Sequence, residues 1–128
     1  MMQKVPILQV ENLTVSFDTL RGRIRVVDRL SFSLNVGKVL GVVGESGSGK
    51  SITSLAVMGL LPANAVIESG RILYNGRDLL TLSPAKRRMI RGREIAMIFQ
   101  DPMSGLDPCY TVEFQLSESL KELGTSIG

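Results

Sequence analysis

Histidine is absent from this chain of 128 residues, cysteine occurs once, and long apolar runs are missing. Without histidine the chain has neither Ser-His nor Cys-His catalysis, nor a histidine-ligated metal site. The single cysteine, Cys109, excludes an internal disulfide and is typical of a reducing compartment. No apolar run approaches the roughly 18 residues that a membrane-spanning helix needs. Because no apolar segment follows residues 1–6, we expect no secretory signal.

The composition is that of a folded globular chain with a mild positive charge. Apolar residues make up 44% and charged residues 21%, and 15 basic against 12 acidic residues give a net charge of +3. This charge is too small to indicate a nucleic-acid partner or a polybasic membrane anchor. A basic cluster at Lys86, Arg87, Arg88, Arg91 and Arg93 lacks interleaved aromatic residues. We interpret it as a solvated helix face, with an acidic partner as the alternative, and we expect no nucleic-acid binding.

The first third of the chain alternates apolar and polar residues with a period of two. Residues 7–17 predict a strand whose phase slips near Asn12, which indicates a bulge. A turn over residues 18–23 and return strands over residues 24–27 and 30–36 follow. The alternation predicts antiparallel strands with one buried face.

Two later segments are continuously apolar rather than alternating. Residues 39–43 and 95–99 therefore predict strands covered on both faces, as in a parallel sheet. Other elements are predicted from their boundary signals: a helix over residues 50–61 that Pro62 stops, a strand over residues 70–74 before the Asn75-Gly76 turn, a helix starting at Ser83-Pro84, and a last helix between Thr111 and Gly124.

One motif carries a specific chemistry. Residues 44–51 match G-x-x-x-x-G-K-[ST] between a predicted buried strand and a predicted helix. Glycines let backbone N–H groups approach phosphate oxygens, and a helix start adds aligned N–H dipoles. Lys50 would reach the β- and γ-phosphates, and the Ser51 hydroxyl would bind Mg²⁺. The alternative is a glycine-rich turn without a ligand. The candidate nucleotide-binding residues are Gly44, Glu45, Ser46, Gly47, Ser48, Gly49, Lys50, Ser51 and Ile52.

The order of motifs resembles that of ATP-binding-cassette (ABC) transporter ATPases. The resemblance rests on residues 13–17, 27–33, the phosphate loop, residues 70–72 and residues 97–102. The phosphate loop together with Met97-Ile98-Phe99-Gln100-Asp101-Pro102-Met103 resembles, more narrowly, the ATP-binding subunits of dipeptide and oligopeptide importers. This resemblance implies an α/β P-loop NTPase fold of the ABC ATPase type, with an N-terminal antiparallel β-subdomain and an incomplete C-terminal part.

The resemblance also implies roles for two residues outside the phosphate loop. Phe17 stands where the family has an aromatic residue that stacks on adenine, although an ordinary strand core residue is an equal interpretation. Gln100 matches the glutamine of the family's Q-loop, which joins the Mg²⁺ shell or orients the attacking water; the alternative is a surface glutamine. The implied cofactors are ATP and Mg²⁺, and the implied catalytic residues are Lys50 and Gln100.

The chain departs from the family pattern after Gln100. It contains no LSGGQ-type signature, no apolar strand ending in Asp-Glu and no histidine. We therefore expect the N-terminal portion of a nucleotide-binding domain with little hydrolysis of its own. Its expected parts are a β-subdomain over residues 1–38, P-loop core with Q-loop over residues 39–100, and the start of a helical subdomain over residues 101–128.

The partners implied by the resemblance are transmembrane permease subunits, a second ATP-binding subunit and, indirectly, a solute-binding protein. The implied location is peripheral, on the cytoplasmic face of the membrane. Two other functions stay open at this point. One is a nucleotide-binding fragment that neither hydrolyses ATP nor serves transport. The other is a small-molecule kinase, which would need a lid for which the basic residues 86–91 are the sole candidate.

Overall fold

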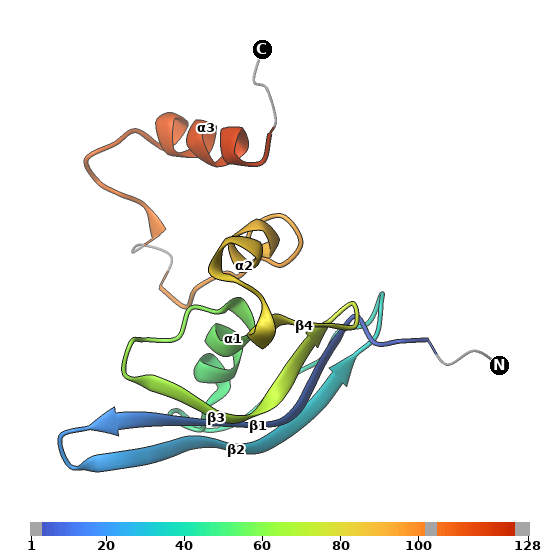
Figure 1. Ribbon diagram of the computed structural model, residues 1–128. Helices are drawn as coiled ribbons and strands as arrows, with labels where there is room; N and C mark the ends of the chain where they lie inside the picture. Colours follow the sequence, from blue (N-terminus) through green and yellow to red (C-terminus); the bar gives the residue numbers. More distant parts are fainter. Residues whose placement is uncertain (1–3, 102–104, 125–128) are drawn as a thin grey trace. The chain divides into compact units, whose positions relative to one another are not determined.

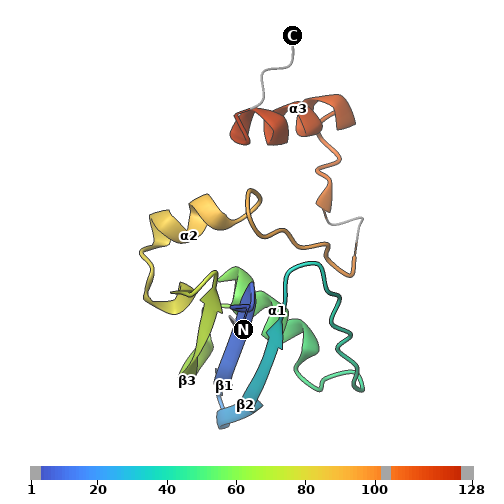
Figure 2. The same ribbon diagram turned by 90° about the vertical axis from the view of Figure 1, so that its right-hand side faces the viewer.

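The computed structural model describes residues 4–101 and 105–124, which form two compact units divided between Arg87 and Arg88 (Figures 1 and 2). The first unit holds a sheet, the helix α1 and a short turn of 3₁₀ helix, η1. The second holds α3, and α2 crosses the boundary. The elements are β1 (Leu8–Thr19), β2 (Gly22–Leu34), α1 (Lys50–Met58), β3 (Ala65–Tyr74), β4 (Arg77–Asp78), η1 (Leu79–Thr81), α2 (Pro84–Ile90) and α3 (Val112–Glu122).

The sheet of the first unit is antiparallel throughout, as the period-two pattern predicts. Its strand order is β2-β1-β3-β4, so β1 pairs with neighbours on both sides. Its central residues Leu13, Val15 and Ile72 are fully buried, and α1 lies over one face of the sheet (Figures 1 and 2). Burying such side chains stabilises the unit by roughly 1.5–3 kcal/mol each.

The expected bulge near Asn12 is confirmed. The pairing of β1 with β2 shifts between Val10 and Leu13, and Asn12 has a left-handed φ of 47°. On the neighbouring strand, Gly70 has a φ of 104°, and a Cβ there would lie 2.6 Å from the Leu13 Cα. The bulge therefore requires glycine at position 70, because the two backbones leave no room for a side chain.

The boundary residues in the sequence predicted the starts of α2 and α3 and, to within three residues, the end of α1. Gly59 adopts a left-handed φ of 68° and ends α1 at Met58, three residues before the predicted Leu61. Ser83 accepts a hydrogen bond from the Lys86 N–H at 3.4 Å at the start of α2. Thr111 caps α3 by accepting the Phe114 N–H at 3.2 Å.

Two strand predictions were wrong. Neither residues 39–43 nor residues 95–99 form a strand in the part of the chain that the structure describes, apart from one isolated parallel bridge between Arg91 and Ile95. Val39 and Ile98 are 98% and 96% exposed. A buried parallel strand needs partners along its edges and cover on both faces, and the described residues supply neither. Smaller corrections concern length: β2 is one strand rather than two, and β3 starts at Ala65 rather than Gly70.

Candidate functional site: the phosphate loop

The phosphate loop of the first unit is a tight turn that leads directly into α1. Gly47 and Gly49 adopt left-handed φ values of 83° and 92°. The Ser48 N–H donates to the Glu45 carbonyl oxygen at 3.1 Å and closes the turn. These backbone conformations are strained for residues with a Cβ, which explains the glycines at positions 47 and 49, the second of which is a fixed glycine of the motif.

The same glycines let the loop fold against itself and against β2. A Cβ on Gly44 would lie 2.5 Å from the Ser48 Oγ. A Cβ on Gly49 would lie 2.8 Å from the Val26 carbonyl oxygen and 3.1 Å from a Val27 methyl group. The end of the loop is thus seated directly on the backbone of β2.

The start of α1 suits an anion. Gly49 is the N-cap and supplies no side-chain hydrogen bond, and the first turn holds no acidic residue. The Gly49 carbonyl accepts from both the N–H and the hydroxyl of Thr53, at 2.9 and 2.8 Å. The N–H groups of Lys50, Ser51 and Ile52 precede the first intrahelical bond and point toward the helix start. With the positive end of the helix dipole, they fit a phosphate group.

Lys50 turns its ammonium group back into the loop. It donates to the Gly44 carbonyl oxygen, to the Glu45 carbonyl oxygen at 2.7 Å and to the Ser48 Oγ at 3.2 Å. These three bonds match the three donors of an ammonium group. A polyphosphate in the loop must therefore take over at least one bond that Lys50 now makes to the loop itself.

Ser51 and Gln100, the two predicted magnesium ligands, lie in different units. Ser51 is exposed in the first turn of α1, and Gln100 is exposed in the second unit after the irregular segment 95–99. Pro102 and Met103, which contributed to the family resemblance, lie outside the described residues. Nowhere in residues 4–101 and 105–124 do three or more His, Cys, Asp or Glu side chains gather in a way that could hold a metal ion.

Phe17 lies on β1 beside the seat of the phosphate loop. It is half-buried and pairs with Ile24 on β2 and with Ala65 on β3. Ile24 precedes Val26 by two residues, which is about 7 Å along a strand. The Phe17–Ile24 pair and the contact with Gly49 are therefore near neighbours along β2.

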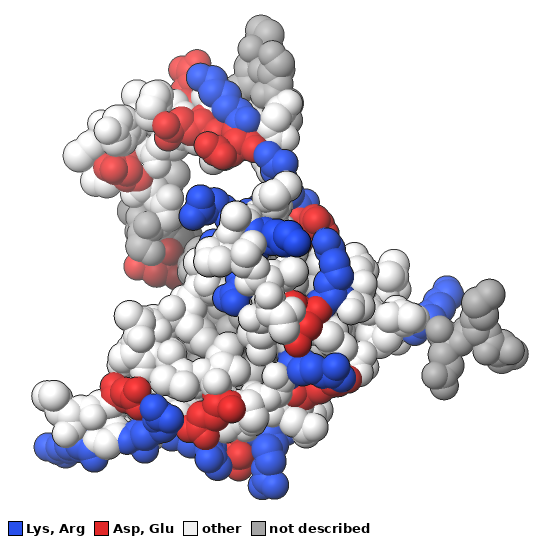
Figure 3. All heavy atoms as spheres, viewed as in Figure 1, with Lys and Arg blue, Asp and Glu red and all other residues white. Residues whose placement is uncertain are grey.

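Charged side chains of both signs pair near the Phe17 end of the sheet (Figure 3). Arg23 donates to Asp18 at 2.7 Å, and this hydrogen bond holds the pKa of the Asp18 carboxyl below its ordinary value. The pKa of Glu68 is also lowered, first by the neighbouring Ser16 hydroxyl and then by Arg25. Because the Ser16 Oγ is buried without a hydrogen bond of ordinary geometry, we regard its influence as that of a nearby dipole.

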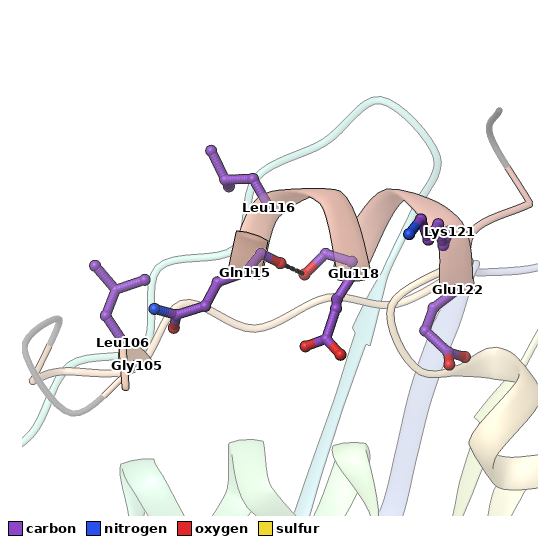
Figure 4. A pocket seen from close by; sticks show the side chains of 8 residues that line it. Gly105, Leu106, Gln115, Leu116, Glu118, Lys121 and Glu122 are labelled. Carbon is purple, nitrogen blue, oxygen red and sulfur yellow. Dashed lines mark hydrogen bonds between the residues drawn. The ribbon is translucent and has the colours of Figure 1, made fainter. Parts of the chain in front are cut away.

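The second unit has a hollow of its own. It has a volume of about 540 Å³ and is lined by the loop at Gly105 and Leu106 and by one side of α3 (Figure 4). Gln115 ties the two parts together, since its side chain accepts from the Asp107 N–H at 2.8 Å and donates to the Asp107 carbonyl at 2.9 Å. None of the predicted site residues lines this hollow.

The sequence reasoning missed the part that β2 plays in seating the loop. Val26 and Val27 are consecutive apolar residues and are followed by two consecutive polar residues, and this break in the alternation of β2 was the available signal. The contact with Gly49 could not be foreseen, because it joins segments that are more than 20 positions apart in the sequence.

Curated relatives match most of this chain but only part of their own length. The chain is 49% identical over 115 residues to the dipeptide transport ATP-binding protein DppD of Escherichia coli (strain K12), covering 90% of this chain and 35% of the relative. It is 51% identical over 120 residues to DppD of Bacillus subtilis (strain 168), with 93% and 35% covered. It is 48% identical over 116 residues to the oligopeptide transport ATP-binding protein OppD of Haemophilus influenzae, with 91% and 36% covered. The chain thus spans about a third of these relatives.

Solved structures and a family model agree with the expected fold. The crystal structure of the ADP conformation of MJ1267, an ATP-binding cassette of an ABC transporter, is 26% identical with a TM-score of 0.55, covering 71% of this chain and 34% of the other. A nucleotide-free ATP-binding cassette of an ABC transporter shares the fold at 23% identity and a TM-score of 0.55, with 92% and 46% covered. Across the described residues, no helix has the length and apolar character of a membrane span. The family model for ABC transporters matches residues 27–125, so this chain belongs to the ABC transporter family and has its P-loop ATPase fold with an N-terminal antiparallel sheet.

Proposed function

We propose that this chain binds ATP with Mg²⁺ at the phosphate loop, as the ATP-binding part of an importer for dipeptides or oligopeptides. The observation that carries the proposal is the glycine loop that closes onto the uncapped start of α1, with the Lys50 ammonium at its centre. An anion there would satisfy N–H groups that no side chain caps. The peptide class rests on the similarity to DppD and OppD.

In this proposal, the backbone N–H groups over residues 44–52 hold the phosphates. Lys50 exchanges a bond to the loop for one to the β- and γ-phosphates, where its charge is better compensated. Ser51 and Gln100 would hold Mg²⁺, which supplies neutralisation of the phosphate charge when bound. Phe17 would stack on the adenine ring, for which its half-buried position leaves part of the side chain accessible.

We propose further that the chain comprises a β-subdomain (residues 1–38), a P-loop core with Q-loop (residues 39–100) and the start of a helical subdomain (residues 101–128). The whole protein would be peripheral to the cytoplasmic face of the membrane and would work with permease subunits, a second ATP-binding subunit and a solute-binding protein. For this chain alone we propose binding with little turnover, because its sequence has no LSGGQ-type signature, Asp-Glu strand end or histidine.

Calorimetry with ATP, with and without Mg²⁺, tests the nucleotide site. Lys50→Ala should weaken binding by roughly tenfold or more, since hydrogen bonds to charged groups contribute about 1.5–3 kcal/mol. Lys38→Ala is the matched control, because Lys38 is an exposed lysine outside the loop, and it should leave the affinity within about twofold. Absence of magnesium-dependent binding in the unchanged chain, or equal affinity in both variants, would contradict the proposal.

Measuring phosphate release from ATP with the same protein tests the proposal that this chain binds ATP with little turnover. We expect saturable ATP binding without appreciable release of phosphate. Robust turnover that Lys50→Ala abolishes would show that the sequence carries a complete catalytic set, contrary to the proposal of a binding portion.

A further inference from the structure

Strand β2 contains one residue more than its partner beside the phosphate loop. Val27 pairs with Val15 and Arg25 pairs with Ser16, so Val26 has no counterpart on β1. An extra residue of this kind is a β-bulge, which turns the backbone locally and redirects the groups of the bulged residue.

The bulged residue is the one that meets the phosphate loop. The Val26 carbonyl oxygen lies 2.8 Å from the place where a Cβ of Gly49 would be, and a Val27 methyl group lies 3.1 Å from it. Gly49 is also the N-cap of α1. The backbone at the bulge and the start of the helix are therefore in direct contact.

The bulge also decides which face of the sheet Ile24 occupies. Val27 and Ile24 are three residues apart, a spacing that puts them on opposite faces of a regular strand. Because Val26 is extra, both instead pair with residues on one face of β1: Val27 with the buried Val15, and Ile24 with Phe17.

We infer that the bulge at Val26 is a positioning element for nucleotide binding, which sets the place of the phosphate loop relative to the Phe17–Ile24 pair. This inference rests on the proposed binding of ATP at the loop with Phe17 under the base. A base stacked on Phe17 and a polyphosphate in the loop belong to one ligand, so both must be held at a single separation. The bulge contacts the loop with Val26 and leads into Ile24 two residues away.

Deletion of Val26 tests the inference with little other change to the sheet. The shortened strand keeps the pairs Val27 with Val15, Arg25 with Ser16 and Ile24 with Phe17, but it lacks the bulge at Val26. We expect the affinity for tripolyphosphate, which needs only the loop, to change by less than about threefold. The ratio of ATP affinity to tripolyphosphate affinity should fall by roughly fivefold or more, because the stacked base no longer aligns with the phosphates. An unchanged ratio would overturn the inference.

A second bulge on β2 supplies the matched control. The pairing shifts again between Leu13–Leu30 and Val15–Val27, where Arg29 has a φ of 47°. Deletion of Arg29 removes that bulge in the same way and should leave the ratio unchanged. If both deletions lower the ratio equally, the effect is a general distortion of β2 and the inference fails. If the unchanged chain binds neither ATP nor tripolyphosphate with Mg²⁺, the proposed function fails first.

Hydrogen exchange on the unchanged chain gives a second test that needs no variant to fold. Tripolyphosphate has no base that could stack on Phe17. It should nevertheless slow amide exchange at residues 25–27, because ordering the loop also orders the bulge against Gly49. Amides of β4 should not respond. Exchange at residues 25–27 that is the same with and without tripolyphosphate, under conditions where calorimetry shows binding, would overturn the inference.

Discussion

The antiparallel sheet of the first unit is rich in strand-forming apolar residues, and so are the two continuous apolar segments, residues 39–43 and 95–99. The centre of the sheet is buried, whereas most apolar residues of the two segments are exposed. Leu13 and Val15 in the sheet are 0% exposed, whereas Val43 is 93% exposed. Hydrophobicity alone therefore does not decide burial in this chain. What differs is strand pairing, because β1 has a hydrogen-bonded neighbour on each side and the two apolar segments form no strand in the described residues.

In the sheet, β1 meets β2 through a tight turn between Thr19 and Gly22. Antiparallel strands can be joined by such short connections. Strand β1 also pairs with β3, which follows only after β2 and α1 in the sequence. Parallel strands need a crossover and cover on both faces. Apart from the isolated bridge between Arg91 and Ile95, the described residues give segments 39–43 and 95–99 no such partner, and most of their apolar side chains stay in contact with water.

The largest expected effect on the free energy of unfolding comes from comparing one glycine substitution in the sheet with one in an apolar segment. Gly70→Ala should destabilise the first unit by at least about 2 kcal/mol, because its φ of 104° disfavours alanine and the new Cβ would lie 2.6 Å from the Leu13 Cα. Gly41→Ala is the control in the apolar segment, where nothing lies within 4 Å of the new atom. Urea unfolding should separate the two variants clearly, and equal midpoints would mean that the sheet is not packed as described.

A valine pair tests the same contrast at smaller amplitude. Val15→Ala should cost roughly 1.5 kcal/mol, because it removes two buried methyl groups and leaves a small cavity. Val43→Ala removes the same atoms from an exposed position and should change the free energy of unfolding by less than about 0.5 kcal/mol. A cost at Val43 as large as that at Val15 would show that the apolar segment is buried in solution, and the comparison would break.

The smallest effect concerns pH. The pKa values of Asp18 and Glu68 are lowered in the fold, so their contribution to stability is present above the pKa of the unfolded chain, about 4, and is lost as the pH falls through the lowered values. We expect a slight extra loss of thermal stability below about pH 4 that Asp18→Asn with Glu68→Gln removes. The Asp18 side chain is 53% exposed and that of Glu68 is 22% exposed, so 1 M salt should reduce the effect, chiefly at Asp18. A pH profile that the double variant leaves unchanged would contradict it.

Much of the fold could be predicted because its signals are local. The Asn75-Gly76 turn, the Ser83 start of α2 and the Thr111 cap depend on the residue itself and a few neighbours. The bulge at Asn12 had a local signal in the slip of phase, although its packing also needs Gly70 on β3. The tight turn at residues 44–49 has a local signal as well, since Gly47 and Gly49 adopt a left-handed backbone that few other residues accept. The roles of Phe17 and Gln100 remain predictions.

The sequence by itself determined the alternation that makes an antiparallel sheet, the positions of turns and caps, and the glycine-lysine pattern of the phosphate loop. These features follow from side-chain periodicity and from backbone conformations that few residue types adopt. Only the tertiary structure decided that the Lys50 ammonium bonds to its own loop, that Val26 seats Gly49, and that residues 39–43 are exposed. The Val26–Gly49 contact and the exposure of residues 39–43 depend on which distant segments come together, and the Lys50 bonds depend on the three-dimensional path of the loop, which side-chain periodicity does not specify.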